Sequence, residues 1–418
     1  MKGLVICNMS YIRPFCALRP KQEFAEKIAA LPYDVYDTEE ARQIVSANSF
    51  SFLAIDRAEV NFEKGHDPYS KEVYEKASSL IKEWTLQGRF IRDDKPCYYV
   101  YSMTLDGRTQ TGIVGCFSID DYIDGTIKKH ENTREDKEID RINHVYTCKA
   151  QTGPIFLAYR ANEVIFDITS KAMTKEPLYS FVTPEGVSQE VYIIDEADDI
   201  KAVADAFKKI RHIYIADGHH RCASAVKVGL RMREENPGYT GEEEFNFCLG
   251  VFFPEDELSI MDYNRVVKDL NGYTYNSFLE KLSEMFDIKE SDKAVKPLFK
   301  GTFGMFLNRR WYKLVAKDSI KSSDPVDGLD VSILQNNVLG PILGIKDPKT
   351  DKRIDFVGGA RGLMELEKRV LGGFEVAFSM HPTSMGELLR VADNNLLMPP
   401  KSTWFEPKLL SGLFIHEI

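Results

Sequence analysis

A short polar turn between two apolar segments carries the residues of this chain that are best suited to chemistry. The turn consists of Asp217, Gly218, His219, His220 and Arg221. A β-prone run at residues 213–216 precedes it, and apolar residues recur at helical spacing over residues 223–232. The sequence therefore predicts a strand, a tight turn and a helix, with the free N–H groups and the positive dipole end of the helix at the turn.

Such a helix start binds anions, and an arginine in the first turn opposes the helix dipole unless an acidic ligand is present. Gly218 permits a close backbone approach or a positive φ. We therefore expect a phosphate or carboxylate pocket at residues 217–221. The residues alone leave open that the turn is an ordinary connection whose histidines cap the helix, stack or face water.

Residues 128–141, KKHENTREDKEIDR, form the second unusual segment. Dense mixed charge is typical of a solvated helix face with salt bridges. However, His130, Glu131, Asn132 and Thr133 have little apolar support and follow expected strands, where catalytic loops often lie. Both interpretations stay open from the residues alone.

Two segments near the C-terminus are weaker candidates. The glycine-rich turn at residues 358–362, which contains Arg361, matches neither the dinucleotide-binding motif nor the P-loop. The loop at residues 398–405 contains Lys401, Ser402 and Thr403 beside two rigid prolines. This loop suits either phosphate binding or bracing between domains, and its residues do not decide between them.

Composition limits the possible classes of function. The 418 residues are 43% hydrophobic and 28% charged, as in soluble globular proteins with two or three domains. A formal net charge of −10 argues against non-specific binding to nucleic acid or an anionic membrane. The seven cysteines form no C-x-x-C pair, which is typical of a reducing compartment. No apolar run reaches ~18 residues, and the first residues lack a signal-peptide pattern, so we expect a cytoplasmic location.

Periodicity places helices and strands along the rest of the chain. A helix is expected over residues 73–84, and a hairpin over residues 98–105 and 111–117. Residues 52–55 resemble a buried strand. Residues 354–416 alternate strands with helices, which indicates an α/β arrangement.

Five segments together resemble the signatures of a known bacterial family, and they follow that family's order. They are RPF at 13–15, LPYDV at 31–35, HENT at 130–133, ADGHHR at 216–221 and MPPKST at 398–403. On these segments the chain is identified as a member of the domain of unknown function 1015 family over essentially its whole length. Members of this family tend to be cytoplasmic and are linked to serine metabolism by gene neighbourhood, so the resemblance implies a role there.

A second, local resemblance covers about residues 110–235. The turn is similar to the phosphate-gripping element of the ParB/sulfiredoxin-like superfamily, which includes free serine kinases and binds nucleotide without a Walker loop. By this resemblance the turn contacts the phosphates of ATP or ADP, and Glu131 accepts the proton of the serine hydroxyl. Asp217 could orient a histidine, bind the substrate amine or hold Mg²⁺ through water.

The expected fold is mixed α/β, with a ParB/sulfiredoxin-like catalytic core at residues 111–240. An N-terminal α+β portion at residues 1–110 precedes the core, and a C-terminal α+β domain at residues 241–418 follows it. The expected function is phosphoryl transfer on a small hydroxy amino acid, by a nucleotide-dependent enzyme similar to free serine kinases.

In this hypothesis the chemical roles fall into three groups. The catalytic residues are Glu131, Asp217, His219 and Arg221. Phosphate or nucleotide is bound by Gly218, His219, His220, Arg221, Lys401, Ser402 and Thr403. The substrate is bound by His130, Asn132, Thr133 and Arg361. Glu131 acts as a base only if burial raises the pKa of its carboxyl towards the working pH.

Three alternatives remain. The same pocket suits a phosphohydrolase that acts on phosphoserine, or a non-catalytic protein that senses nucleotide. A zinc enzyme would use His130, Glu131, His219 and His220, but adjacent histidines do not easily face one metal and the H-E-x-x-H spacing is absent. We expect a small-molecule substrate as the partner, and neither nucleic acid nor a membrane. Whether the chain forms a homodimer stays open.

Overall fold

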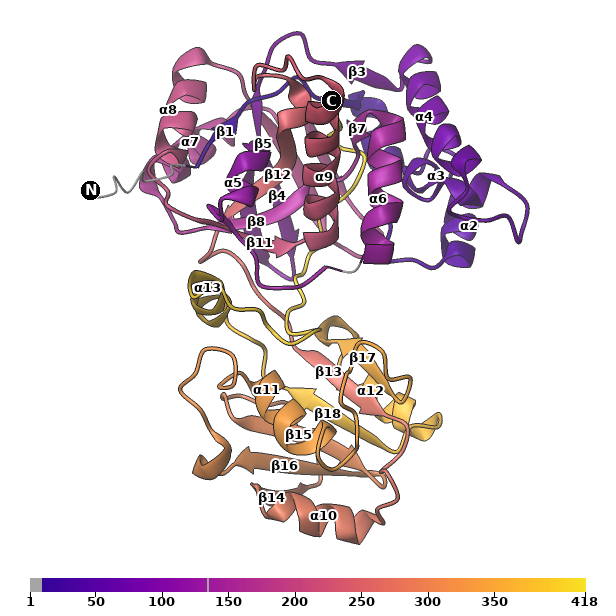
Figure 1. The fold of residues 1–418 in the computed structure, drawn as a ribbon, viewed down its shortest axis with the longest axis vertical. Coiled ribbons are helices and arrows are strands. Elements are labelled where there is room, and N and C mark those ends of the chain that lie inside the picture. Colours follow the sequence, from indigo (N-terminus) through magenta and orange to yellow (C-terminus); the bar gives the residue numbers. More distant parts are fainter. Residues whose placement is uncertain (1–9, 134) are drawn as a thin grey trace. The chain divides into compact units, whose positions relative to one another are not determined.

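The computed structural model describes residues 10–133 and 135–418, and these fall into two compact units. Unit 1 combines the chain up to Leu258 with Pro407–Ile418, and unit 2 is Ser259–Glu406. Each unit is built on its own sheet with helices beside it (Figure 1). The mixed α/β class expected from the sequence is confirmed.

The large sheet of unit 1 has nine strands in the order β6-β11-β8-β12-β5-β4-β10-β9, and β1 pairs with β5. Two neighbouring pairs, β6 with β11 and β8 with β12, are parallel, and the other pairs in this sheet are antiparallel. The strands are β1 Ile12–Arg13, β4 Tyr98–Leu105, β5 Arg108–Ser118, β6 Ile127–Lys128, β8 Ile155–Tyr159, β9 Tyr179–Val182, β10 Ser188–Ile194, β11 Ile213–Asp217 and β12 Phe247–Pro254.

This sheet explains why the units do not follow the boundaries expected near residues 110 and 240. A boundary at residue 110 would cut the β4–β5 hairpin, in which Leu105 pairs with Arg108 and Tyr99 with Val114. A boundary at residue 240 would remove β12, which lies between β8 and β5 inside the sheet. The expected N-terminal portion and core therefore belong to one unit, which also includes the last residues of the chain.

The β4–β5 hairpin is one of the elements that local sequence determines. Its two-residue turn has φ of 51° at Asp106 and 76° at Gly107. An Asp-Gly pair tolerates positive φ at both positions, and this turn matches the twist of paired strands. The hairpin expected from the sequence is confirmed.

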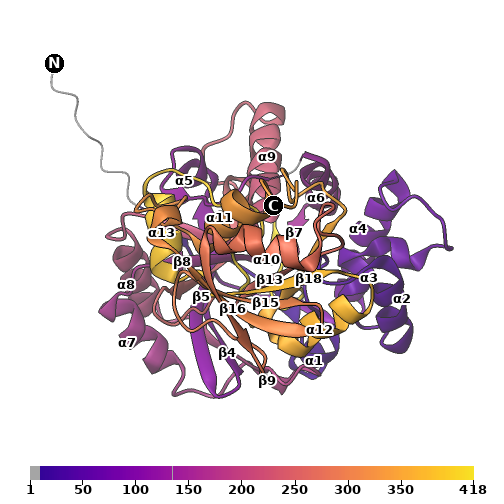
Figure 2. The same ribbon diagram turned by 90° about the horizontal axis from the view of Figure 1, so that it is seen from below.

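The helices of unit 1 lie beside the large sheet and also form a second hydrophobic cluster, which is mainly helical. They are α1 Ala25–Ile28, α2 Thr38–Ala47, α3 Leu53–Asp56, α4 Lys71–Leu86, α5 Ile119–Ile123, α6 Glu135–Cys148, α7 Glu163–Ala172, α8 Ala197–Phe207 and α9 His219–Glu235. Helices α6 and α9 lie side by side (Figure 1), and α4 contacts α6 (Figure 2). Two further strand pairs are β2 Leu18–Pro20 with β3 Phe90–Arg92, and β7 Ala150–Gln151 with β19 His416–Glu417.

The strand expected at residues 52–55 is wrong, because Leu53–Asp56 is the short helix α3. All four of its residues are buried, including Asp56. A continuous apolar run of four residues has no periodicity that separates a buried strand from a buried helical turn. The helix expected over residues 73–84 is confirmed within α4.

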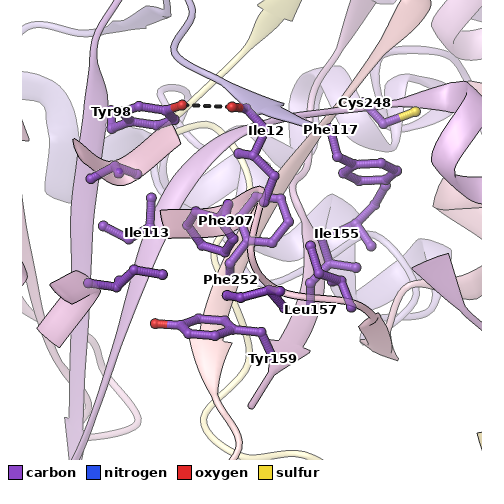
Figure 3. Packing of buried hydrophobic residues seen from close by; sticks show 14 of the residues in the cluster. Ile12, Tyr98, Ile113, Phe117, Ile155, Leu157, Tyr159, Phe207, Cys248 and Phe252 are labelled. Atoms are coloured by element: carbon purple, nitrogen blue, oxygen red, sulfur yellow. Dashed lines mark hydrogen bonds between the residues drawn. The ribbon is translucent and has the colours of Figure 1, made fainter. Parts of the chain in front are cut away.

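The main hydrophobic core of unit 1 joins the sheet to α7, α8 and α9. Figure 3 shows Leu157, Phe207 and Phe252 packed together inside this cluster. At its margin the hydroxyl of Tyr98 donates a hydrogen bond to the carbonyl of Ile12 at 2.8 Å, which satisfies a buried polar group. The core therefore fixes the strands whose ends carry the polar turn.

Unit 2 is a six-stranded antiparallel sheet in the order β14-β16-β15-β18-β13-β17. Its strands are β13 Tyr263–Val267, β14 Phe286–Ser291, β15 Thr302–Leu307, β16 Arg310–Ala316, β17 Ile354–Gly358 and β18 Val376–Met380. Its helices are α10 Tyr275–Ser283, α11 Asp330–Leu334, α12 Leu363–Leu371 and α13 Met385–Asp393. Across both units, the described residues include no helix with the length and apolar character needed to cross a membrane.

Candidate functional site

The polar turn lies where β11 ends and α9 begins. β11 ends at Asp217, Gly218 has φ of 89°, and α9 starts at His219. Any side chain at position 218 meets two obstacles, because φ is left-handed and a Cβ there would lie 3.0 Å from Nη2 of Arg221. The predicted strand, tight turn and helix are confirmed. We call residues 217–221 the corner.

The loop at residues 130–133 lies against the corner because β6 and β11 run parallel. Ile127 pairs with Ile213, and Lys128 pairs with Tyr214. The carboxyl ends of parallel strands meet at one edge of a sheet, which is where α/β proteins commonly bind ligands. The rings of His130 and His219 accordingly meet edge to face, with centroids 4.5 Å apart. Two segments that are distant in sequence thus form one site.

The two histidines of this contact are buried, and three of their four ring nitrogens lack hydrogen-bond partners among the described residues. His130 is 1% exposed and His219 is 6% exposed. Neither ring nitrogen of His130, nor Nε2 of His219, has a hydrogen-bond partner among the described residues. Leaving such a buried group unsatisfied costs ~1–3 kcal/mol. The unsatisfied nitrogens therefore favour a ligand at this position.

Burial also keeps both rings uncharged. It lowers the pKa of His130 to about 4, although the negative charge of Asp217 acts in the opposite direction. Burial and the neighbouring His130 lower the pKa of His219 well below its ordinary value. Each ring is therefore neutral at physiological pH and offers one N–H donor and one acceptor nitrogen. The histidines can hydrogen-bond to an anion, whereas the positive charge must come from other residues.

Asp217 is paired with the cations that supply this charge. Its Oδ2 lies 3.5 Å from Nη2 of Arg221 and 3.4 Å from Nζ of Lys408. Burial alone raises the pKa of the Asp217 carboxyl, but the charges of Lys408 and Arg221 outweigh it and lower the pKa to about 2. Asp217 is therefore ionised, and it positions two cations at the corner.

These pairs bear on the expected role of Asp217 towards Mg²⁺. The same carboxylate oxygen already faces both cations, so direct coordination of a metal would have to displace them. Among the side chains that the structure describes, no three His, Cys, Asp or Glu residues are grouped as a metal site requires. Mg²⁺ held by Asp217 through water stays a prediction.

The guanidinium of Arg221 is held by its surroundings. Its Nη1 donates a hydrogen bond to the carbonyl of Pro154 at 2.6 Å, and its side chain is 11% exposed. Gly153 and Gly218 flank it, because a Cβ on Gly153 would lie 3.5 Å from Nη1 and one on Gly218 3.0 Å from Nη2. A group fixed in this way is preorganised for an anion, since little side-chain freedom is lost on binding.

The other residues of the expected loop differ in exposure. Glu131 follows His130 directly and is half-buried, whereas Asn132 is exposed. The hydroxyl of Thr133 donates a hydrogen bond to the carboxylate of Glu138. The assignment of Glu131 as a base, and of Asn132 and Thr133 as substrate ligands, stays a prediction.

Besides Lys408, the structure adds two charged residues near the corner, Glu138 and Lys227, that the sequence analysis did not name individually. Glu138 is 5% exposed and forms an ion pair with Lys227. Burial raises the pKa of Glu138, but Lys227 and Thr133 outweigh it, with His220 contributing in the same direction, so the pKa is lowered. Glu138 is therefore a buried, ionised carboxylate that ties α6 to α9.

The charge-dense segment at residues 128–141 is therefore only partly a solvated helix face, which is what its mixed charge had indicated. α6 begins at Glu135, and Glu138, Arg141 and His144 are all buried on it. Their spacing of three residues places them on one side of the helix. That spacing was a signal available in the sequence, whereas nothing local marks Lys408, which reaches Asp217 from the final segment. Residue 134 lies outside the described residues.

A small cavity of about 30 Å³ lies behind Arg221 within unit 1. Its polar lining comes from five separate segments, and Arg221 is the residue shared with the corner. The polar lining residues are Tyr33, Asp56, Arg141, His144, Gln151, Thr152 and Arg221. Tyr33 belongs to the LPYDV segment, so this segment contributes to the lining of the cavity.

The weaker candidate loops belong to unit 2, and they adjoin each other there. A Cβ on Gly358 would lie 2.9 Å from the ring of Trp404, so the glycine-rich turn and the 398–405 loop lie in contact. Lys401 has φ of 60°, and its carbonyl accepts a hydrogen bond from Nη2 of Arg265 at 2.9 Å. The positive φ of a non-glycine residue is thus held by a buried arginine.

The hydroxyl groups near this loop are also engaged within unit 2. Ser402 donates to the carbonyl of Pro399 at 2.5 Å, and Thr383 donates to the carbonyl of Ser402 at 3.0 Å. These bonds brace the loop. The expected roles of Lys401, Ser402 and Thr403 in phosphate or nucleotide binding, and of Arg361 in substrate binding, stay predictions.

Several solved structures share a distant likeness with this chain. A free serine kinase mutant in complex with AMP is 12% identical, with a TM-score of 0.34, over 70% of this chain and 87% of that one. A conserved hypothetical protein from Pyrococcus furiosus is 15% identical, with a TM-score of 0.34, over 70% and 91% of the two chains. C-terminally truncated SbnI from Staphylococcus aureus is 10% identical, with a TM-score of 0.38, over 71% and 85%. At these scores the likeness carries no functional argument.

Comparison at the level of sequence gives a firmer result. No curated protein matches the chain. A family model matches residues 12–332, which include every residue of the corner and of the 130–133 loop, whereas residues 398–403 lie beyond the match. This span covers well over half of the chain, so the chain belongs to the family described as "Protein of unknown function (DUF1015)".

Proposed function

We propose that the protein transfers a phosphoryl group from a nucleotide, ATP or ADP, to the hydroxyl of a small amino acid, with free serine as the first candidate. The observation that carries this proposal is the contact between His130 and His219, because it joins the acid-bearing loop to the anion-binding corner. Phosphoryl transfer depends mainly on positioning and on neutralising charge. The corner provides both.

Asp217, His219 and Arg221 of the corner have defined parts in this reaction, together with His130 and Lys408 beside it. Arg221 and the positive dipole end of α9 offset the negative charge of the transferring phosphoryl group. The neutral rings of His130 and His219 donate hydrogen bonds to its oxygens. Asp217 holds Arg221 and Lys408 in place. These roles use both the unsatisfied ring nitrogens of His130 and His219 and the preorganised guanidinium of Arg221.

The chemical step balances without a covalent enzyme intermediate. The serine hydroxyl oxygen attacks the terminal phosphorus of the nucleotide, and a new phosphorus–oxygen bond forms. The bond between that phosphorus and the bridging oxygen breaks, and the leaving nucleotide keeps the electron pair. The proton of the hydroxyl passes to the carboxylate of Glu131, which is half-buried beside His130.

The decisive experiment incubates the purified chain with L-serine plus ATP or ADP, and separately with phosphoserine alone. The proposal predicts phosphoserine that forms only when a nucleotide is present. Nucleotide-free release of phosphate from phosphoserine would instead indicate a phosphohydrolase that uses the same corner. Nucleotide binding without any turnover would indicate a nucleotide-sensing protein, and either result would overturn the proposal.

The role of Glu131 is tested by Glu131→Gln, which keeps the size of the side chain but removes the base. Removing a general base lowers kcat by ~10²–10⁴. Glu135→Gln is a matched control, because Glu135 is an exposed glutamate four residues further along. Equal rates for the two variants would exclude Glu131 as the base.

A further inference from the structure

The final segment of unit 1, Pro407–Ile418, brings a lysine to the corner. Nζ of Lys408 lies 3.4 Å from Oδ2 of Asp217, and the same oxygen faces Nη2 of Arg221 at 3.5 Å. Lys408 lies beyond the residues that the family model matches, and it is almost 190 residues away from the corner in sequence. Tertiary packing alone therefore adds this cation to the site.

The backbone that carries Lys408 is fixed within unit 1. Leu410 and Ser411, which follow it closely, are both 2% exposed. Ser411 packs against Gly153, because a Cβ on Gly153 would lie 3.0 Å from Oγ of Ser411 and 3.5 Å from Nη1 of Arg221. The packing of Ser411 on Gly153 therefore brings the final segment and Arg221 together, independently of the ion pair between Lys408 and the corner.

The three side chains of the ion pairs carry a net positive charge. Burial raises the pKa of the Asp217 carboxyl, but Lys408 and then Arg221 outweigh it and lower the pKa to about 2. One ionised carboxylate thus faces two cations, and both contacts are longer than the about 2.7–2.9 Å of a strong charge-assisted hydrogen bond. An anion that binds both cations would therefore replace weak contacts and not strong ones.

The buried histidines lie beside the same carboxylate. The negative charge of Asp217 acts on the pKa of both His130 and His219, so all three groups are close together. Three ring nitrogens of these histidines have no hydrogen-bond partner among the described residues. A carboxylate ligand would bring one charge, whereas a terminal phosphate brings a charge of about −2 and three acceptor oxygens. The phosphate matches two cations and two imidazole donors better.

We propose that Lys408 is a phosphate-binding residue, whose ammonium group binds the same terminal phosphate as the guanidinium of Arg221. Its side chain is 15% exposed, and a lysine ammonium is a compact charge on a flexible stem. The ammonium group can therefore turn from Asp217 to a ligand while the backbone stays in place. The proposal rests on the proposed function only for the identity of the phosphate carrier as a nucleotide.

The test measures binding by calorimetry on the full chain, without serine, using ADP and inorganic pyrophosphate. Pyrophosphate lacks the nucleoside, so it reports on phosphate binding alone. Lys408→Met should weaken the binding of both ligands by roughly tenfold or more, which is the usual contribution of one charge-assisted hydrogen bond. Lys408→Gln should cause the same loss, and it takes the place of the methionine variant if that variant does not fold.

Lys201→Met is the matched control for these variants. The Lys201 side chain is 78% exposed on α8, where it pairs with Asp205. This substitution also removes one lysine charge from unit 1, but it should change the affinity for neither ligand. Lys408 variants that bind ADP and pyrophosphate as tightly as the Lys201 variant would overturn the proposal.

A double substitution separates direct binding from neutralisation of Asp217. A lysine that only offset the negative charge of Asp217 would also help an anion to bind. In that case Lys408→Met would cost no affinity in a protein that already carries Asp217→Asn. Direct binding instead predicts that the loss of roughly tenfold persists in the Asp217→Asn protein. A loss that disappears there would overturn the proposal.

These measurements separate the role of Lys408 from the reaction. A loss of affinity for ADP and pyrophosphate in the Lys408 variants, without phosphoserine formation by the unchanged protein, would retain Lys408 and reject the kinase. Phosphoserine formation with a nucleotide KM that Lys408→Met does not change would retain the kinase and reject Lys408. Binding of neither ADP nor pyrophosphate by the unchanged protein would reject Lys408, whatever the serine assay shows.

Discussion

The corner in unit 1 and the 398–405 loop in unit 2 drew attention for the same reason, because each places basic and polar residues beside glycine or proline. Their hydrogen bonding differs. At the corner and the adjoining His130, three imidazole nitrogens of His130 and His219 lack partners among the described residues. In the loop, the hydroxyl of Ser402 and the carbonyl of Lys401 are both bonded within unit 2.

Residue type alone therefore does not separate a binding site from a structural brace. Native proteins satisfy nearly all buried polar groups, so unsatisfied nitrogens beside a preorganised arginine point to a ligand. A loop whose polar groups are satisfied by its own unit has a sufficient structural explanation.

The largest effect is expected for Arg221→Lys in the corner. A lysine ammonium cannot reach Pro154, Asp217 and a phosphate in the way that a planar guanidinium can. Removing one preorganised donor to developing charge lowers the rate by ~10²–10³, which kcat/KM for phosphoserine formation should show.

Arg231→Lys is the control for this substitution, because Arg231 lies exposed on the same helix, where it pairs with Glu235 and stacks on Tyr146. Its kcat/KM should stay close to that of the unchanged protein. If Lys401→Met in unit 2 lowered kcat/KM as much as Arg221→Lys, the loop would be a binding site and the comparison would fail.

The second prediction concerns the buried histidines and pH. The pKa of His130 is lowered from 6.5 to about 4 in the folded protein, so the unfolded chain takes up a proton first as the pH falls. The contribution of this group to stability is therefore intact above pH 6.5 and is lost as the pH falls towards 4. At 1.36 kcal/mol per unit, the loss reaches about 3 kcal/mol.

The measurement compares urea unfolding of the unchanged protein and of His130→Gln across this range of pH. The free-energy difference between them should change by about 3 kcal/mol from pH 6.5 to pH 4. The two proteins must be compared because Asp121, in the same unit, also affects stability in this range of pH. Burial raises the pKa of Asp121 to about 7, so its effect on stability is opposite to that of His130 as the pH falls. A difference independent of pH would mean that the ring of His130 is not held neutral by burial.

How far the sequence predicted the site depends on which contacts are local. The strand, turn and helix at the corner follow from residues 213–232, and the hairpin follows from Asp106-Gly107. The strand β6 has only two residues, so no periodicity marks it, yet its pairing with β11 brings His130 to His219. The meeting of the two motifs was therefore a hypothesis from family resemblance.

Other features could not be read from local patterns. Lys408 and Pro154 reach Asp217 and Arg221 only through tertiary packing. The apolar run at residues 52–55 gave no period, and its assignment as a strand was wrong, because it forms α3 with Asp56 at the cavity. In this molecule, short strands and short helices were the elements that the sequence left undetermined.

The third prediction separates backbone strain from contact at the corner. Gly218 and Gly125 both have positive φ, of 89° and 83°, but only Gly218 has neighbours that a Cβ would meet. Forcing a side chain into this region costs ~1–2 kcal/mol, so both alanine variants should lose this much stability in urea unfolding. Gly218→Ala should in addition lower kcat/KM, because its Cβ would displace the guanidinium of Arg221. An equal effect of both variants on kcat/KM would mean that the position of Arg221 does not matter.

The smallest effect is expected for Ser402→Ala in the loop of unit 2. The substitution removes the hydrogen bond to Pro399 and with it ~0.5–1.5 kcal/mol of stability. Hydrogen exchange should then rise in peptides of unit 2 and stay unchanged in unit 1. Ser283→Ala removes a similar bond to Glu280 at an exposed position and should cost less. Removing a structural hydrogen bond raises hydrogen exchange, whereas removing a ligand contact weakens ligand binding. Loss of nucleotide binding with unchanged exchange in unit 2 would therefore make Ser402 a ligand-binding residue and reject its assignment as a brace.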